Sequence, residues 1–179
     1  KGADFYCAPK LSPDGTRLAW IEWRHPNLPW DGTQLKEAEI AEDGALGKAM
    51  VLAGYDDIAV FQPEYAPDGT LFYVADDDGY WNIYRAGRDP EHYAFEADFG
   101  LPHWIFGMRT YGFLDNARIL CTFSRLGDWA LGVIDLESGE LTELDLPWCE
   151  FDGLVCGNGK AAFLGGRVDG PGEIVELDV

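Results

Sequence analysis

The chain has 179 residues, 47% of them hydrophobic and 14% aromatic, which is too apolar for a disordered chain and enough to bury a core. Its 13 basic and 32 acidic side chains give a net charge of −19, which repels phosphate backbones and argues against a nucleic-acid partner. No apolar run approaches the roughly 20 residues that span a bilayer, so no membrane partner is expected.

The first predicted unit, residues 5–53, is built around the turn Pro13-Asp14-Gly15. In such a turn Pro presets φ, the Asp side chain accepts backbone hydrogen bonds, and Gly adopts a positive φ. Apolar runs separated by polar or Gly-rich turns predict four short strands in this unit. These strands are expected at residues 5–11, 17–23, 34–40 and 49–52.

The pattern returns three more times along the chain. Pro67-Asp68-Gly69 begins the second copy, and weaker copies start at Asp115 and Asn158. From Asp14 onward the turns recur after 54, 47 and 43 residues, a spacing typical of four-stranded propeller blades. The units are predicted at residues 58–97, 103–146 and 150–179. Their strands are expected at 58–65, 71–75, 81–86 and 93–97, then 105–114, 119–123, 130–136 and 141–146, then 151–156, 161–164 and 173–177.

The predicted fold class is therefore all-β, a β-propeller sector of about four four-stranded antiparallel blades over residues 1–179, with the fourth blade lacking its outer strand. No long 3.6-residue period predicts a helix. Four blades could close a small ring, but a sector of a larger ring is the interpretation we favour. Because an open sector leaves a blade face uncovered, the isolated chain is expected to self-associate.

The segment Leu18–Thr33 resembles the propeller of bacterial acylaminoacyl-peptidase and dipeptidyl-aminopeptidase-like enzymes of the prolyl oligopeptidase family. The resemblance continues through residues 61–69, 80–85, 97–100 and 103–108 and fades after about Pro147. In that family the propeller sits over an α/β-hydrolase domain, which follows it in the chain, and restricts access to a Ser-Asp-His site. The resemblance implies a serine peptidase as the parent protein, with its hydrolase domain and a peptide substrate as partners.

The chain itself carries no Gly-x-Ser-x-Gly nucleophile elbow. Its serines, Ser12, Ser124 and Ser138, fall in or beside predicted strands and turns. No catalytic residue and no cofactor are therefore assigned, and the resemblance implies gating of substrate access and docking on a hydrolase domain absent from the chain. A free-standing TolB-like propeller scaffold for protein or peptide binding is the alternative. An enzyme built on the propeller itself would need converging carboxylates or histidines, which the repeats do not show.

Two segments are candidate sites. A loop with two prolines interrupts the first unit, and its candidate domain-contact or substrate-entrance residues are His25, Pro26, Asn27, Trp30 and Asp31. Trp104, Phe106 and Arg109 are predicted on or near the inner strand of the third unit, where side chains can face the central channel. For both segments, packing within the blade is the alternative.

Metal and redox chemistry find little support in the sequence. His25, His92 and His103 lack ligand spacing and are interpreted as ordinary surface or hydrogen-bonded histidines. The cysteines form no CxxC pair and are interpreted as mostly buried thiols of a cytoplasmic protein. They are Cys7, Cys121, Cys149 and Cys156.

The acidic run Asp76–Gly79 does not fit a calcium-binding loop, because Val74 and Arg85 stand where oxygen ligands would be required. It is predicted to be a hairpin turn. Asp56-Asp57 and Glu42–Gly44 are interpreted in the same way, as solvated turns, so no metal site is predicted.

Overall fold

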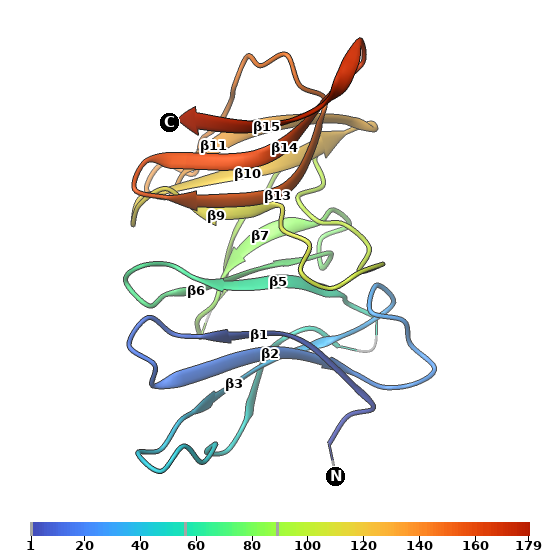
Figure 1. Ribbon diagram of the computed structural model, residues 1–179. Coiled ribbons are helices and arrows are strands. Elements are labelled where there is room, and N and C mark those ends of the chain that lie inside the picture. The colour runs from blue at the N-terminus through green and yellow to red at the C-terminus, as the bar shows by residue number, and fades with distance from the viewer. Residues whose placement is uncertain (1, 56, 89) are drawn as a thin grey trace.

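The computed structural model describes residues 2–55, 57–88 and 90–179, which form four separate antiparallel sheets (Figure 1). Asp56, predicted to lie in a solvated turn, is outside the described residues. Each sheet is a meander in chain order, and the four sheets follow one another from the N-terminus to the C-terminus without closing into a ring. The chain is therefore an open propeller sector, and the small closed ring is excluded.

The strand bounds follow the repeat closely. The first sheet contains β1 (Phe5–Leu11), β2 (Arg17–Trp23), β3 (Gln34–Glu39) and β4 (Met50–Ala53). The second contains β5 (Val60–Tyr65), β6 (Leu71–Ala75), β7 (Asn82–Arg85) and β8 (Glu91–Tyr93). The third contains β9 (Tyr111–Phe113), β10 (Arg118–Arg125), β11 (Asp128–Asp135) and β12 (Leu141–Glu143). The fourth contains β13 (Glu150–Gly157), β14 (Lys160–Arg167) and β15 (Gly170–Asp178), without an outer strand, as predicted.

The repeated turn has the local chemistry that its sequence predicts. In three sheets an aspartate Oδ1 accepts the backbone N–H two residues later, at 3.0 Å from Thr16 to Asp14, 2.8 Å from Thr70 to Asp68 and 2.8 Å from Ala117 to Asp115. In the fourth sheet Asn158 and Gly159, both at positive φ, make a two-residue turn instead. The turn between the first two strands of each blade is thus fixed by residues within it.

Three apolar cores hold the sector together, and each lies between neighbouring sheets. Ile21 and Leu35 of the first sheet pack with Tyr73 of the second. Phe72 of the second sheet packs against Phe113 of the third, with ring centroids 5.2 Å apart. A smaller core joins the third and fourth sheets around Leu120, Leu131, Leu154 and Phe163. Because each sheet buries its faces against its neighbours, the sheets pack as propeller blades do.

Three predicted strands were too long. The predicted strand 141–146 ends at Glu143, and the other two are shortened for one shared physical reason. Residues 94–97 do not continue β8, because the Asn82 amide takes both backbone groups of Phe95, at 3.2 Å to its carbonyl and 3.1 Å from its N–H. Residues 105–110 do not belong to β9, because the buried Gln62 amide accepts the N–H of Thr110 at 2.7 Å. A side-chain amide thus replaces the strand ladder in both places.

The inner strands β1 and β5 carry the same irregularity. The register of β1 shifts between Cys7 and Lys10, and that of β5 shifts between Phe61 and Glu64. Within these bulges Ala8 has a φ of 49° and Gln62 a φ of 42°, values that non-glycine residues rarely adopt.

The part of the chain that the structure describes contains no helix with the length and apolar character needed to span a membrane.

Candidate functional site

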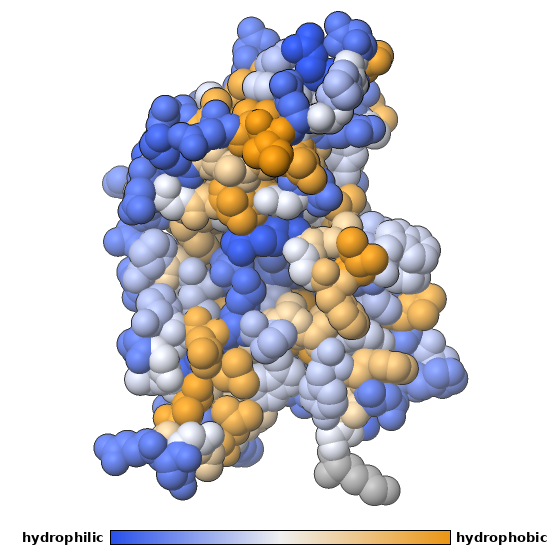
Figure 2. Space-filling model, in the orientation of Figure 1, coloured by the Kyte–Doolittle hydropathy of each residue, from blue (hydrophilic) through white to orange (hydrophobic). Residues whose placement is uncertain are grey.

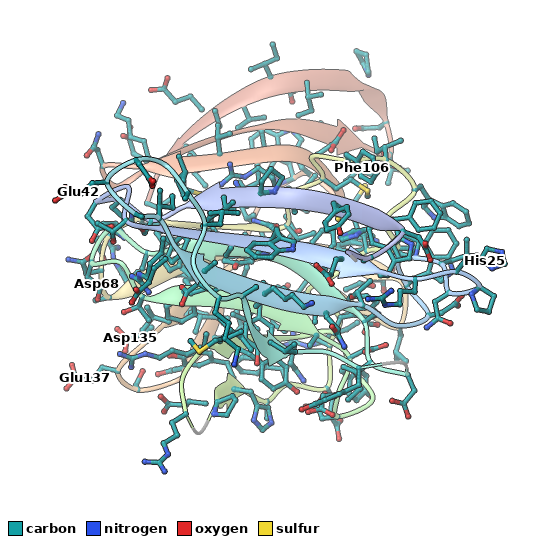
Figure 3. The ribbon with its side chains drawn as sticks, turned by 90° about the horizontal axis from the view of Figure 1, so that it is seen from below. His25, Glu42, Asp68, Phe106, Asp135 and Glu137 are labelled. Atoms are coloured by element: carbon teal, nitrogen blue, oxygen red, sulfur yellow. The ribbon has the colours of Figure 1, made fainter. Side chains whose placement is uncertain are left out.

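The two ends of the sector differ in character. We call the end that carries residues 24–33 and 94–110 the loop end, and the opposite end, which carries the Pro-Asp-Gly turns, the turn end. Figure 3 shows His25 and Phe106 at the loop end, and Glu42, Asp68, Asp135 and Glu137 at the turn end. Both candidate segments predicted from the sequence therefore lie at the same end of the molecule.

The first candidate segment is the loop after β2. Its path is set by two backbone turn bonds, from Asn27 N to Arg24 O and from Asp31 N to Leu28 O, each of 3.0 Å. The Asp31 carboxylate also accepts the N–H of Leu28 at 2.8 Å, and His25 N donates to the carboxylate of Asp4 at 3.0 Å. The loop is thus an ordered structure tied to the N-terminal segment, with His25, Pro26 and Asp31 exposed.

A cavity of about 350 Å³ lies beside this loop. It is formed by the loop, the start of β3, the N-terminal segment and the connection to the second blade. Its lining includes Glu22, Trp23, His25, Pro26, Asn27 and Tyr55. Glu22 is nearly buried and paired with Lys36 Nζ at 2.6 Å, and that pairing lowers the pKa of Glu22 against the opposing effect of burial. Three of the predicted loop residues therefore line one hollow.

The second candidate segment, residues 101–109, is an irregular connection and not part of an inner strand. Trp104 and Phe106 are each 72% exposed and Ile105 is 67% exposed. Gly107 has a φ of +85° with open space around it, so its place is explained by backbone conformation and not by close packing. Trp104, Phe106 and Arg109 do not lie on the inner strand, because that strand begins only at Tyr111. That their side chains face the central channel stays a prediction.

An aromatic contact joins the two candidate segments. The rings of Trp30 and Trp104 lie 4.4 Å apart between centroids, at an interplanar angle of 46°. Trp30 is partly buried while Trp104 remains largely exposed. Residues 74 positions apart in sequence thus form one aromatic surface at the loop end, a contact that neither segment predicts alone.

His103 differs from the other histidines. Its ring is largely buried, 4.6 Å from the ring of Phe61 between centroids, and its Nδ1 has no hydrogen-bond partner in the described part of the chain. Burial lowers its pKa to about 4, so the ring is neutral at pH 7. The interpretation of His103 as an ordinary surface or hydrogen-bonded residue is therefore wrong, whereas His92 stacks on Tyr84 beside Asp78.

Arg109 lies against an inner strand of the second blade. Its Nη2 is 3.2 Å from Glu64 Oε2, the same oxygen that Lys10 Nζ reaches at 2.7 Å. The sequence analysis singled out Arg109 but missed Lys10 and Glu64. A signal for them was present, since Pro9-Lys10 and Pro63-Glu64 occupy equivalent places ahead of the first two Pro-Asp-Gly turns.

Among the comparisons with known proteins, only the comparison with solved structures gives matches. No protein-family model and no curated protein matches the chain. Among solved structures, puromycin hydrolase matches 99% of the chain at 36% identity with a TM-score of 0.92. A puromycin-hydrolyzing peptidase of Mycobacterium tuberculosis matches the same share at 33% identity, also with a TM-score of 0.92. The chain belongs to the prolyl oligopeptidase family.

Within this family the chain corresponds to a part of the propeller. It spans 27% of the length of each of these two relatives, which are serine peptidases of the family. TolB from Acinetobacter baumannii also matches, over 98% of the chain with a TM-score of 0.70, but at 14% identity this likeness shows the propeller fold alone. The family resemblance given by residues 18–33 and the later motifs is thus confirmed.

The remaining sequence candidates have structural explanations in this propeller sector. Asp76 O accepts the N–H of Gly79 at 3.2 Å, which gives the predicted hairpin turn. The turn at Glu42–Gly44 is closed by a 2.8 Å bond from Gly44 N to Ala41 O. Among the described residues, no three His, Cys, Asp or Glu side chains gather closely enough to hold a metal ion. All four cysteines are free thiols, with Cys7 and Cys121 buried.

Proposed function

We propose that this chain is a non-catalytic sector of a peptidase propeller, whose loop end docks on the hydrolase domain of its parent protein and restricts the path of peptide substrates. The observation that supports this proposal is the contact of Trp30 with the exposed Trp104, together with the exposure of Phe106 in the same connection as Trp104. Figure 2 shows apolar surface where the connection between β8 and β9 reaches the loop end. Exposed apolar side chains gathered at one end of a protein are typical of an interaction surface.

A structural role for the serines supports the assignment of catalysis to another part of the parent protein. Ser12 Oγ donates to Asp14 at 2.6 Å and Ser138 Oγ donates to Asp135 at 2.9 Å, both within turns. Ser124 lies near the end of β10, with its backbone bonded to Asp98. Each serine thus has a part in a turn or a sheet, and none stands in a nucleophile elbow.

The second candidate function is a free-standing scaffold like TolB, which the shared fold favours. The coding sequence that follows codon 179 would distinguish the peptidase propeller from the free-standing scaffold. A following region with a Gly-x-Ser-x-Gly elbow would support the peptidase propeller, whereas its absence would favour the scaffold.

In the parent peptidase, the double variant Trp104→Ala/Phe106→Ala tests gating directly. It should raise cleavage of a long peptide relative to a dipeptide naphthylamide by roughly threefold in kcat/KM, because a gate discriminates by substrate size. Leu11→Ala is the matched control, since Leu11 is an apolar residue 61% exposed on β1, outside the loop end. An unchanged ratio in the double variant would contradict gating by this surface.

We also propose that the isolated chain self-associates through its fourth sheet. That sheet exposes Val155 by 49%, Leu164 by 51% and Ile174 by 84%, and Figure 2 shows apolar surface over the same sheet. A second copy would cover this surface in the way that a neighbouring blade covers it in a ring. Light scattering on a gel-filtration column should give a dimer or larger species, and a monomer at micromolar concentration would contradict the proposal.

The free thiols support a reducing, cytoplasmic location.

A further inference from the structure

A second cavity, of about 220 Å³, lies between the inner strands β1 and β5 and the connection that precedes β9. Both strand bulges contribute to its wall, and its other side is formed by consecutive residues of the connection. The lining residues used below are Ala8, Lys10, Gln62, His103, Phe106 and Arg109. This cavity is distinct from the hollow beside residues 24–33.

The charges at this cavity do not balance. Lys10 and Arg109 both pair with one oxygen of Glu64, at 2.7 and 3.2 Å. Two cations against one carboxylate leave one positive charge uncompensated within the cluster. The three side chains are only 17–30% exposed, so water screens that charge incompletely. In a chain of net charge −19 this local excess is unusual.

Two residues of the cavity lining, Arg109 and His103, each have a buried polar atom without a partner. Arg109 Nε and His103 Nδ1 have no hydrogen-bond partner among the described residues. Buried polar groups are nearly always hydrogen-bonded, so each such atom calls for an explanation. An acceptor bound next to the guanidinium of Arg109 would supply a partner once the side chain adjusts to it.

The bulged inner strands form one wall of the cavity. Ala8 and Gln62, both in that wall, adopt left-handed φ values of 49° and 42°, conformations that cost on the order of 1–3 kcal/mol each. The inner strand β13 has the same register shift around Gly153, whose φ is 63°, away from this cavity, so the bulge belongs to the blade repeat. In β1 and β5 the bulge is followed by Lys10 and Glu64, which meet in one cluster.

We propose that this cavity binds a carboxylate group of a peptide, with Arg109 and Lys10 as the cationic partners and Phe106 as apolar contact for a neighbouring side chain. One uncompensated positive charge fits a monoanion, and the planar guanidinium of Arg109 suits a carboxylate in particular. That the peptide is a substrate rests on the proposed function; the binding site itself does not. The carboxylate is either the C-terminus of the peptide or an acidic side chain.

The test uses the 179-residue chain and three short peptides, with binding followed by NMR chemical shifts. Acetyl-Phe-Leu with a free C-terminus carries its carboxylate at the C-terminus, and acetyl-Phe-Glu-amide carries it on a side chain. The C-terminal amide of acetyl-Phe-Leu has no carboxylate. We expect at least one of the two acids to bind about tenfold more tightly than the uncharged amide, the size of effect given by one charge-assisted hydrogen bond. Which acid binds identifies the source of the carboxylate.

Arg109→Gln should lower the affinity for the preferred acid by about tenfold. Arg125→Gln is the matched control, because Arg125 pairs with Glu143 on the outer strands of the third blade and should leave binding unchanged. If Arg109→Gln unfolds the chain, Lys10→Gln is used as the test variant. The comparison of the acids with the amide uses the unchanged protein and so does not depend on any variant.

Equal affinity for the acids and the amide, or no saturable shifts with any peptide, would overturn the carboxylate site. Neither result bears on whether the parent protein is a peptidase, because no hydrolysis is measured. Conversely, acid-selective binding by this chain would stand even if the gene beyond codon 179 encoded no hydrolase domain.

Discussion

The turn end and the loop end of the sector are held by different kinds of interaction. At the turn end, Asp14, Asp68 and Asp115 each bond to a backbone N–H only two residues away. At the loop end, Trp30 contacts Trp104, and Gln62 bonds to Thr110, across 74 and 48 positions of sequence. Local bonds make the turn end a repeated structural device, whereas long-range bonds give the loop end its individual shape.

The two ends also differ in their exposed aromatic side chains. Trp104 and Phe106 are each 72% exposed in the connection at the loop end, where Figure 3 labels Phe106. Exposed aromatic side chains favour contact with another molecule. For this reason the proposed interactions are assigned to the loop end.

The largest predicted effect comes from removing the amide that organises the loop end. Gln62→Leu should lower the free energy of unfolding by about 3 kcal/mol, because it leaves the buried N–H of Thr110 and the carbonyl of Tyr111 without their partner. Urea unfolding followed by circular dichroism measures the change. Gln34→Leu, at a half-buried glutamine of β3, should cost less than about 1 kcal/mol. Equal losses in both variants would contradict the special role of Gln62.

One contact at the turn end does cross between blades, and it tests how far that end depends on local bonds. Arg17 Nη2 donates to Gly69 O at 2.7 Å, and its guanidinium lies 5.2 Å from the ring centre of Tyr65. Arg17→Ala should therefore cost about 2 kcal/mol of unfolding free energy. Arg85→Ala, which removes an exposed 3.9 Å pair with Glu91, should cost less than about 0.5 kcal/mol. A similar small loss for Arg17→Ala would show that the turns need no contact between blades.

The aromatic contact at the loop end should have a smaller and asymmetric effect. Trp30→Ala should cost about 1.5 kcal/mol, because the ring of Trp30 is partly buried and packs at a tilt against the ring of Trp104. Trp104→Ala should cost less, because Trp104 is 72% exposed. Trp104→Phe, which keeps an aromatic ring, is the control, and thermal unfolding ranks the three. A greater loss from Trp104→Ala than from Trp30→Ala would contradict this order.

The smallest effect concerns pH and has opposite signs at the two ends. Hydrogen bonds from Ser12 and Thr16 lower the pKa of Asp14 to about 2, and a backbone bond lowers that of Asp68. Their stabilisation is complete above the unfolded pKa of about 3.9 and is lost as the pH falls towards 2. Asp76, between β6 and β7, has its pKa raised by burial, so its contribution is instead present in acid and lost as the pH rises.

Melting temperatures between pH 2 and 7 measure both effects. Asp68→Asn should flatten the loss of stability in acid, because an amide oxygen can accept the Thr70 N–H without titrating. Asp76→Asn should raise the melting temperature slightly at pH 7, because it removes a carboxylate whose ionisation burial disfavours. A fall in stability at pH 7 for Asp76→Asn would contradict this sign.

The blade repeat and its turns could be predicted from the amino-acid sequence. Leu71–Ala75 and Arg17–Trp23 were predicted with the bounds that the structure gives, and the missing outer strand of the fourth sheet was also predicted. The strands and turns depend on apolar runs and on Pro, Asp and Gly at fixed turn positions. Such preferences act between near neighbours in the chain, so they can be recognised without knowledge of the fold.

The limits of β8 and β9 and the assembly of the loop end depend on contacts between segments that are distant in sequence. The Asn82 amide bonds to the backbone just after β8, and the Gln62 amide bonds to the backbone just before β9. The sequences of residues 94–97 and 105–110 do not predict these bonds. The meeting of Lys10, Glu64 and Arg109 likewise joins the first blade, the second blade and the connection that precedes β9. A polar side chain such as the Gln62 amide can form hydrogen bonds with many different groups. The packing of the blades determines which of these groups comes close enough to bond.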